Sequence, residues 1–369
     1  MSLLPRSGFV QHEVEADQAT CHAVCVRKRR ARTSWQLNLV LCRLETIVVT
    51  QTTVDRIVHR EDLDPNNGTV TISWQKVIWL LGNFIVAVVV CIPSFALDTV
   101  MIFIGTTAYT LLFGHSLGMH RLLIHRSYSC PKWIEYLFVH LGVLVGMAGP
   151  FGMITAHDTR DWAQRQKECH PYLRHGSRFL KDGFWQLFCD LSLDRGPNLK
   201  FENRIDHDRV YRFMDRTWML QQLPLALILF LLGGLPFVAW GICARIVVSV
   251  VGHWLVGYFA HNHGGLDHEV EGAAVQGRNV PWTAYLTMGE SWHNNHHAFP
   301  GSAVLGLYEN QPDPGWFALN AMHNLGLVWE IKFPQDLALR PELKAISQRA
   351  QTNPVSKTKP CPILNAAAT

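Results

Sequence analysis

Four long apolar runs, with the charged residues collected between them, restrict the fold of this 369-residue chain more than any other feature. The runs cover residues 77–92, 96–113, 218–240 and 242–260. A helix that crosses a bilayer needs roughly 20 mainly apolar residues, and these runs approach or meet that length. Because backbone groups in lipid must be hydrogen-bonded within the segment, the runs predict an all-α integral membrane protein with four transmembrane helices.

A fifth apolar stretch, residues 136–154, is interrupted by glycines and a proline. Such a stretch favours a re-entrant or interfacial segment over a regular span. A fifth transmembrane helix is the alternative.

The basic residues indicate the orientation of the chain. They concentrate between the second and third runs, whereas the two short connections carry almost none apart from Arg245. The positive-inside rule then places both termini and the long central segment in the cytoplasm. All histidine clusters fall on that same side. The net charge of only +4 gives no reason to expect a nucleic-acid partner.

Outside the apolar runs, the sequence predicts three regions. Residues 1–70, which include the basic run at 27–32, are expected to be a poorly ordered N-terminal extension, with a targeting patch as the alternative. Residues 71–335 would form the membrane domain, and residues 336–369 a C-terminal tail. The nine cysteines are scattered and form no disulfide framework, which indicates a reducing compartment.

The segment 290–297 contains three histidines within five residues. If it is helical, His293, His296 and His297 share one face, because positions i, i+3 and i+4 lie on the same side of an α-helix. They could then converge on one metal ion, since neutral imidazole is a common ligand for transition metals. A histidine run exposed at the surface is the alternative.

A second pair, His120 and His125, follows directly on the second apolar run. Residues five apart are about 140° apart around a regular α-helix and cannot bind one ion from a straight segment. We therefore expect that they serve neighbouring metals or that the helix ends between them. Interfacial histidines without a metal are the alternative.

Two further groups are weaker. One lies at residues 157–175, where His170 is the best candidate, and the other lies on the fourth run, where His253 and His261 share a helical stripe. The predicted metal ligands are His120, His125, His170, His261, His293, His296 and His297. Additional ligands or supporting residues are His157, Cys169, His175 and His253. Seven histidines exceed what one ion can bind, so the set predicts two metals, and its nitrogen-rich chemistry favours iron.

Taken together, these motifs resemble a known family. The sequences His120-Arg-Leu-x-x-His125-Arg-Ser-Tyr, Trp162-Ala163 before His170, and Gly289-Glu290-x-x-His293-Asn-x-His296-His297 are similar to the membrane fatty-acid desaturases. The similarity is closest to the stearoyl-CoA (Δ9-type) branch and covers roughly residues 75–335. It implies a cytosolic helical cap with a histidine-box di-iron centre. It also implies that O2 is used to insert a cis double bond into a fatty acyl chain, carried by CoA or linked to lipid.

The chain departs from the family pattern at two places. The family's second box is usually His-x-x-His-His, whereas residues 166–170 read Gln-Lys-Glu-Cys-His, and Gly257 stands where the Δ9 branch often has asparagine. Replacement ligands would have to come from the additional candidates above, with Cys169 as a thiolate. Otherwise the site would lack ligands.

The partners follow from what the sequence lacks. It contains no fused haem domain, flavin fingerprint or iron–sulfur cysteine set, so electrons must come from a donor such as ferredoxin or a cytochrome b5-like protein with its reductase. No catalytic side chain beyond the metal centre is predicted. Two alternatives stay open: a related membrane lipid hydroxylase or ketolase, and a catalytically silent protein that binds metal or lipid.

Overall fold

The computed structural model describes residues 55–352, so the basic run at 27–32 lies outside the described residues. The longer helices are α1 (Trp74–Val86), α2 (Leu97–Tyr109), α3 (Lys132–Leu144), α4 (Pro150–Gln164), α5 (Phe179–Phe188), α8 (Gln222–Val238), α9 (Arg245–Asn262) and α11 (Pro314–Asn324). Helix α1 continues into η1 (Ala87–Cys91) and α2 into η2 (Thr110–Ile124), and η3 (Ala239–Ala244) joins α8 to α9. The shorter ones are α6 (Asn203–Asp206), α7 (Arg209–Arg216), η4 (Pro281–Thr283), α10 (His293–Ala298), η5 (Pro334–Asp336) and α12 (Gln348–Thr352).

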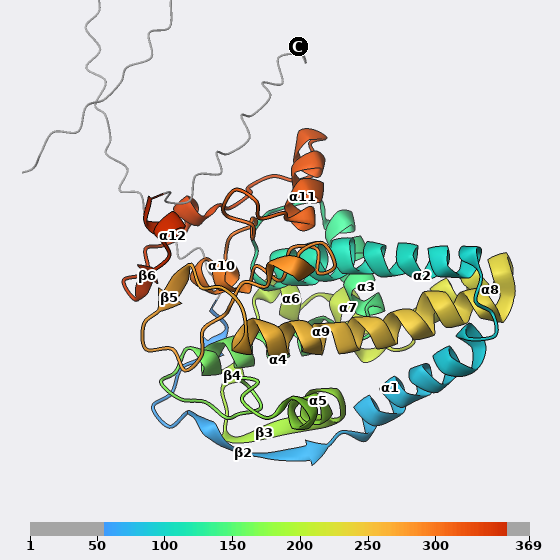
Figure 1. Cartoon of the computed structure of the whole chain (residues 1–369), viewed down its shortest axis with the longest axis horizontal. Helices are drawn as coiled ribbons and strands as arrows, with labels where there is room; N and C mark the ends of the chain where they lie inside the picture. Colours follow the sequence, from blue (N-terminus) through green and yellow to red (C-terminus); the bar gives the residue numbers. More distant parts are fainter. Residues whose placement is uncertain (1–54, 353–369) are drawn as a thin grey trace, which may run out of the picture. The chain divides into compact units, whose positions relative to one another are not determined.

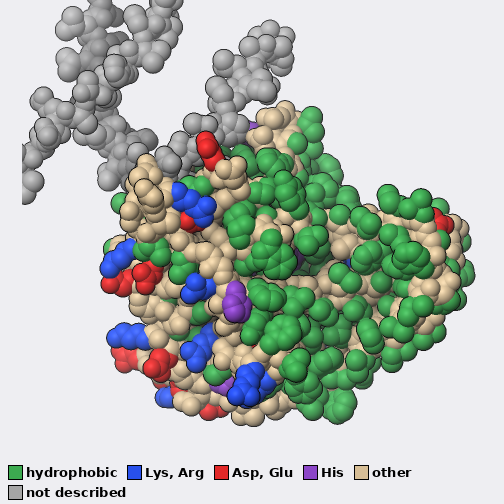
Figure 2. All heavy atoms as spheres, in the orientation of Figure 1, with side chains coloured by type: hydrophobic (Ala, Val, Ile, Leu, Met, Phe, Trp, Pro, Cys, Tyr) green, Lys and Arg blue, Asp and Glu red, His purple; other side chains and the backbone are tan. Residues whose placement is uncertain are grey.

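Apolar helices form one side of the described structure. Three continuous helical segments are long and apolar enough to cross a membrane: Trp74–Cys91, Leu97–Ile124 and Gln222–Asn262. Their surfaces expose large apolar side chains, among them Leu97 and Leu231 at 80% and 75% exposure. Figure 2 shows this hydrophobic surface over α1, α2, α8 and α9, whereas the charged side chains gather at the opposite end. This division suits a lipid environment on one side and water on the other.

The third of these segments corrects a predicted boundary. The sequence predicts that the third run ends near residue 240, but the helical geometry breaks at Gly233 and Gly234, where Gly234 has a φ of 68°. Leu229 packs against Ile242, although 13 residues of straight helix would separate them by about 20 Å. The chain therefore folds back at the glycine pair. Only glycine adopts the left-handed conformation there without strain.

The stretch at 136–154 forms no long helix of its own. It is divided between α3 and the start of α4, and α3 is 13 residues long. Val139 and Val143 are fully buried in α3, which packs along η2. A glycine at Gly118 permits this close approach, because a Cβ there would lie 2.3 Å from the Phe138 carbonyl oxygen.

Short antiparallel strands extend the folded unit beyond the predicted 71–335. β2 (Asp64–Ile72) pairs with β3 (Cys189–Arg195), and β1 (Ile57–Val58) pairs with β4 (Asn198–Leu199). At the other end, β5 (His268–Val270) pairs with β6 (Leu343–Ala345). Figure 1 shows α10, β5, β6 and α12 gathered at the end of the helical layer opposite to α8. Residues 55–70 and 336–352 thus belong to the fold.

Candidate metal centre

The first histidine pair comes together by a route that the helical period does not suggest. Residues 110–124 are π-helical, and the His125 amide donates to the His120 carbonyl at 3.1 Å. In such a segment residue i+5 lies above residue i, so the two side chains leave the helix on one side. Their ring centroids are 4.8 Å apart. The pair therefore faces one point, and both rings belong to one histidine group rather than to two. The helix ends at Ile124, between the two histidines, as the second of the two expected alternatives has it.

Helix α4 adds a third imidazole, that of His157. Its Nε2 lies 3.2 Å from Nε2 of His125. Its Nδ1 lies 3.0 Å from Asp158, whose carboxylate is also paired with Arg56. Burial alone would raise the pKa of Asp158, but His157 and Arg56 lower it below its usual value. A charged carboxylate can only accept, so the His157 proton sits on Nδ1 and Nε2 offers a lone pair to a metal.

Helix α10 divides its histidines between two groups. His120, His125, His157 and His296 have nitrogens within 4.8 Å of one another, and so do His261, His293 and His297. The sequence predicts that the three histidines of α10 converge on one ion; instead, His296 faces the first group, while His293 and His297 face the second. The His293 and His297 Nε2 atoms are 3.1 Å apart, and His296 and His297 have ring centroids 5.7 Å apart. The groups are direct neighbours.

The protonation of these rings fits metal binding. Burial lowers the pKa values of His125, His293, His296 and His297 well below the usual range, so these imidazoles are neutral near pH 7. Ring nitrogens that face one another at 3.1–3.2 Å bring lone pairs together unless a cation or a proton lies between them. Two adjoining clusters of four and three imidazoles could thus hold two transition-metal ions.

Glu290 supports the first group, a role that its sequence motif does not predict. One carboxylate oxygen lies 2.6 Å from Nδ1 of His120, and the other accepts a hydrogen bond from the Ser116 hydroxyl. A carboxylate that holds the outer nitrogen of a ligating imidazole is a common support in metal sites. The only hint in the sequence was its place at the start of the last histidine motif.

Four predicted residues lie outside both groups: His170 and Cys169, and also His175 and His253, which line the cavity described below. His170 follows α4 in a turn, where its Nδ1 accepts from the Tyr172 amide at 3.1 Å and its ring lies against Trp185. Cys169 is buried in an apolar cluster with Trp162 and Tyr172. Burial raises the pKa of its thiol to about 11, which disfavours the thiolate that metal binding needs.

His175 lies beside the second group with both ring nitrogens in use. Its Nδ1 lies 2.9 Å from Asp182, its Nε2 accepts from Arg160 at 2.5 Å, and its ring stacks on His261. The bare backbone of Gly257 makes room for the ring, since a Cβ there would lie 2.9 Å from Nε2. His175 therefore braces His261 rather than facing the group.

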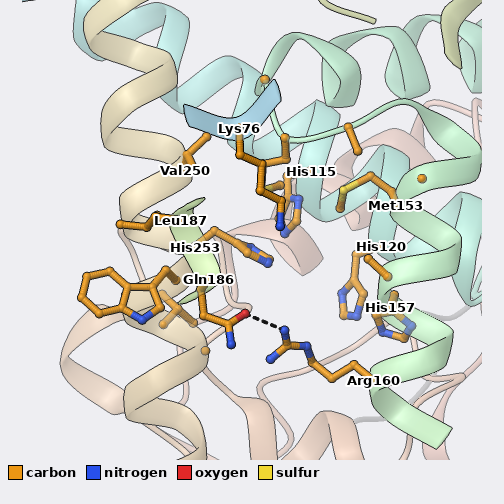
Figure 3. A pocket seen from close by; sticks show the side chains of 18 of the residues that line it. Lys76, His115, His120, Met153, His157, Arg160, Gln186, Leu187, Val250 and His253 are labelled. Carbon is orange, nitrogen blue, oxygen red and sulfur yellow. Dashed lines mark hydrogen bonds between the residues drawn. The ribbon is translucent and has the colours of Figure 1, made fainter. Parts of the chain in front are cut away.

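Both groups open on one cavity of about 610 Å³, within the size range of small-molecule sites. Figure 3 shows His120, His157 and Arg160 on one side of it and His253, Leu187 and Val250 on the other. The cavity continues along α1 and α9, past Trp79, Leu80 and Trp254. His253 packs edge-on against His115 inside this space. An apolar channel therefore runs from the membrane-side helices to the histidines.

Sequence comparisons identify this arrangement. The family model for fatty acid desaturases matches residues 93–307. The chain belongs to the fatty acid desaturase family. Members of this family are oxidoreductases, which confirms the family and the enzyme class predicted from the motifs.

Relatives of this desaturase act on differently carried acyl chains. The chain is 32% identical to an sn-1 stearoyl-lipid 9-desaturase from Synechocystis sp., over 74% of this chain and 86% of that protein. It is 33% identical to one from Anabaena variabilis, over 71% and 94%. It is 30% identical to an acyl-CoA 5-desaturase from Anemone leveillei, over 76% and 88%. These relatives support fatty acyl desaturation as the reaction.

Proposed function

We propose that this desaturase inserts a cis double bond, Δ9-like in position, into a saturated fatty acyl chain at a centre of two iron ions. The observation that carries the proposal is the pair of adjoining histidine groups at the inner end of one largely apolar cavity. The names of the relatives, two of which are 9-desaturases, supply the position.

The reaction needs an oxidant stronger than any side chain. Two hydrogens leave adjacent methylenes, and O2 accepts them together with two electrons and two protons from a donor, giving an alkene and two waters. Two irons held by the histidine groups would supply the oxidising chemistry with O2, which protein groups alone lack. The residues of the chain hold neutral imidazoles in place and keep bulk water away.

The cavity would choose the bond that reacts. An acyl chain has no polar feature along its length, so only the depth of its insertion can place one pair of methylenes at the metals. Trp79 and Trp254 line the route, and the Trp79 indole N–H is fixed by the Gly146 carbonyl at 2.8 Å. The position of the double bond should therefore shift when these side chains become smaller.

Charge pairing at the cavity favours a lipid-linked acyl group over acyl-CoA. Among the described residues, the lysine and arginine that line the cavity are Lys76 and Arg160. Lys76 pairs with Asp190 at 2.7 Å, and Arg160 contacts His175 and Gln186. Both cations are engaged, whereas CoA phosphates would need free ones. Of the two carriers that the sequence resemblance implies, we therefore propose a glycerolipid rather than a CoA ester.

The proposed topology keeps four membrane crossings, with the fold at Gly233 and Gly234 dividing the third helical segment into two. Both termini, the helical cap and the metal centre would then be cytoplasmic. An external donor such as ferredoxin or a cytochrome b5-like protein with its reductase would deliver electrons there.

The test is the lipid profile of cells that lack a desaturase but express this chain with a compatible donor. Gas chromatography with double-bond derivatisation should find one new monounsaturated species, first in membrane glycerolipids and later in free pools. His296→Ala should abolish it while the protein stays in the membrane. If the new species arises first in acyl-CoA, the lipid-linked assignment is wrong. A hydroxylated or keto product would place the chain among the lipid hydroxylases or ketolases, and no product from an iron-loaded protein would contradict desaturation.

A further inference from the structure

The second histidine group has an oxygen neighbour that no histidine motif contains. Gln164 is the last residue of α4, and its side chain is 2% exposed. Its Oε1 lies 3.2 Å from Nε2 of His261. Seven residues earlier on the same helix stands His157 of the first group, and positions i and i+7 share one helical face. Helix α4 thus reaches both groups, with an imidazole at one and an amide at the other.

Hydrogen-bond partners fix which atoms face each other. Nδ1 of His261 lies 2.7 Å from the Gly257 carbonyl, which can only accept, so the ring proton is on Nδ1 and Nε2 carries a lone pair. The amide nitrogen of Gln164 donates to the Leu173 carbonyl at 2.8 Å. Turning the amide over would place two carbonyl oxygens against each other, so Oε1 must point at His261. Two acceptors therefore face each other with no hydrogen between them.

A cation between these atoms removes the conflict. His261 Nε2 is also 3.2 Å from Nε2 of His293, which lies 3.1 Å from that of His297. We propose that Gln164 is the fourth ligand of the second metal, through its amide oxygen. The inference rests on the proposed two-iron centre. It gives the first iron four nitrogen ligands, and the second iron three nitrogen ligands and one oxygen ligand.

The ligand sets make the two metals unequal. An amide oxygen is a neutral, harder and weaker donor than imidazole. The second iron should therefore leave first when a chelator is added, and the two irons should give separate Mössbauer doublets. Gln164 would also stand in for a histidine that the altered second box lacks.

The experiment measures iron per chain and the 57Fe Mössbauer spectrum of full-length protein reconstituted with ferrous iron. Gln164→Leu removes both the oxygen and the amide donor, whereas Gln164→Glu keeps an oxygen and loses the donor to Leu173. Ligation predicts two irons in Gln164→Glu, with one doublet shifted, and one tightly held iron in Gln164→Leu. A purely structural role predicts equal loss in both variants, because both break the bond to Leu173.

Gln186→Leu is the matched control. Gln186 also lines the cavity and donates to a carbonyl, that of Tyr172 at 2.7 Å, but its oxygen accepts from Arg160. It should keep two irons. Two irons in Gln164→Leu, or equal losses in the leucine and glutamate variants, would overturn the inference while the two-iron proposal stands. Fewer than two irons in the unmodified protein would overturn the proposed centre itself. If Gln164→Leu does not fold, the spectrum of Gln164→Glu decides, since an unshifted pair of doublets excludes ligation.

Discussion

The carboxylate of Glu290 lies 2.6 Å from Nδ1 of His120, so the last histidine motif holds the first ligand of the first motif. Arg121 lies 3.7 Å from the same carboxylate. Burial alone would raise the pKa of Glu290, but His120 and then Arg121 lower it to about 2. The carboxylate of Glu290 is therefore charged near pH 7.

Replacing Glu290 by glutamine should weaken the first metal site without unfolding the protein. The amide keeps the shape but loses the charge that makes the His120 ring a stronger donor, and loss of such support costs about 10- to 100-fold in metal affinity. Chelator competition followed by iron analysis measures the effect. Glu271→Gln is the control, since its carboxylate is 62% exposed and pairs with Lys344. Equal affinities in the two variants would show that Glu290 plays no part in metal binding.

The structure reverses the order in which the sequence ranks His170 and His157 as metal ligands. His157 belongs to the first group, whereas His170 lies in a turn outside both groups. We expect His157→Ala to lose about one iron per chain and all activity, and His170→Ala to keep both irons. Iron content and product formation, measured on the same preparations, decide. Loss of iron only in His170→Ala would restore the sequence-based assignment.

Six of the seven predicted ligands fall in the two groups, because their motifs place them at helix ends that meet. The ligand expected from the second motif, His170, lies outside both groups for a physical reason. The motif's expected position at 166–170 lies beyond the end of α4 at Gln164, and the histidine of α4 that joins a group is the earlier residue His157. Gln164 was missed because an amide carries no ligand signal in sequence. It becomes visible only through its contact with His261.

The sequence also does not predict where the backbone departs from a regular α-helix. The 3.6-residue period separates His120 from His125, and only a π-helical backbone brings them together. The fold at Gly233 and Gly234 could have been suspected from the glycine pair, but four apolar runs alone set no exact boundary. Patterns of apolar residues report burial in lipid or protein, and they say little about where a continuous run bends.

Arg245 was assigned to a short connection between spans, yet it lies at the start of α9 and is fully buried. Its guanidinium donates to the carbonyls of Gly241 and Leu144 and to the amide oxygen of Gln222. Arg245→Leu removes all three of these hydrogen bonds, although the Leu144 carbonyl keeps the one from the Gln222 amide nitrogen at 3.0 Å, and should destabilise the fold by about 3 kcal/mol. Thermal unfolding in detergent measures it. Arg245→Lys keeps fewer hydrogen-bond donors, so its Tm should lie between those of the unmodified protein and the leucine variant. An unchanged Tm in the leucine variant would contradict a stabilising role for Arg245.

The contact between Asp267 and Arg349 predicts a pH dependence. The two groups are paired through both carboxylate oxygens at 2.5 Å, which ties α12 to the loop before β5. Burial alone would raise the pKa of Asp267, but Arg349 lowers it below its usual value. A carboxyl whose pKa is lower in the folded than in the unfolded protein stabilises the fold at pH values above its unfolded pKa, about 3.9. This stabilisation is lost as the pH falls through the folded-state pKa. In metal-free protein, Arg349→Met should therefore lower Tm at pH 7, and by progressively less as the pH falls below about 3.9. A difference independent of pH would exclude this linkage.

Asn294 fixes helix α10, which supplies histidines to both groups. Its side-chain oxygen accepts from the amides of Asp267 and His268 at 2.8 and 2.9 Å, and its nitrogen donates to the carbonyls of His268 and Gly277 at 2.8 and 2.7 Å. All four hydrogen-bonding positions of the amide are thus filled.

Asn294→Ala should leave four buried backbone groups without partners, each worth about 1–3 kcal/mol. Because Asn294 touches no metal-facing nitrogen, its loss should loosen both groups together, so the rate at which each iron leaves should rise by a similar factor. Asn294→Asp keeps the two acceptor contacts and should show a smaller increase in that rate. Stopped-flow chelation distinguishes this pattern from the loss of a single iron expected for a ligand. If only one iron leaves faster in Asn294→Ala, the residue acts on one group rather than on the helix that joins them.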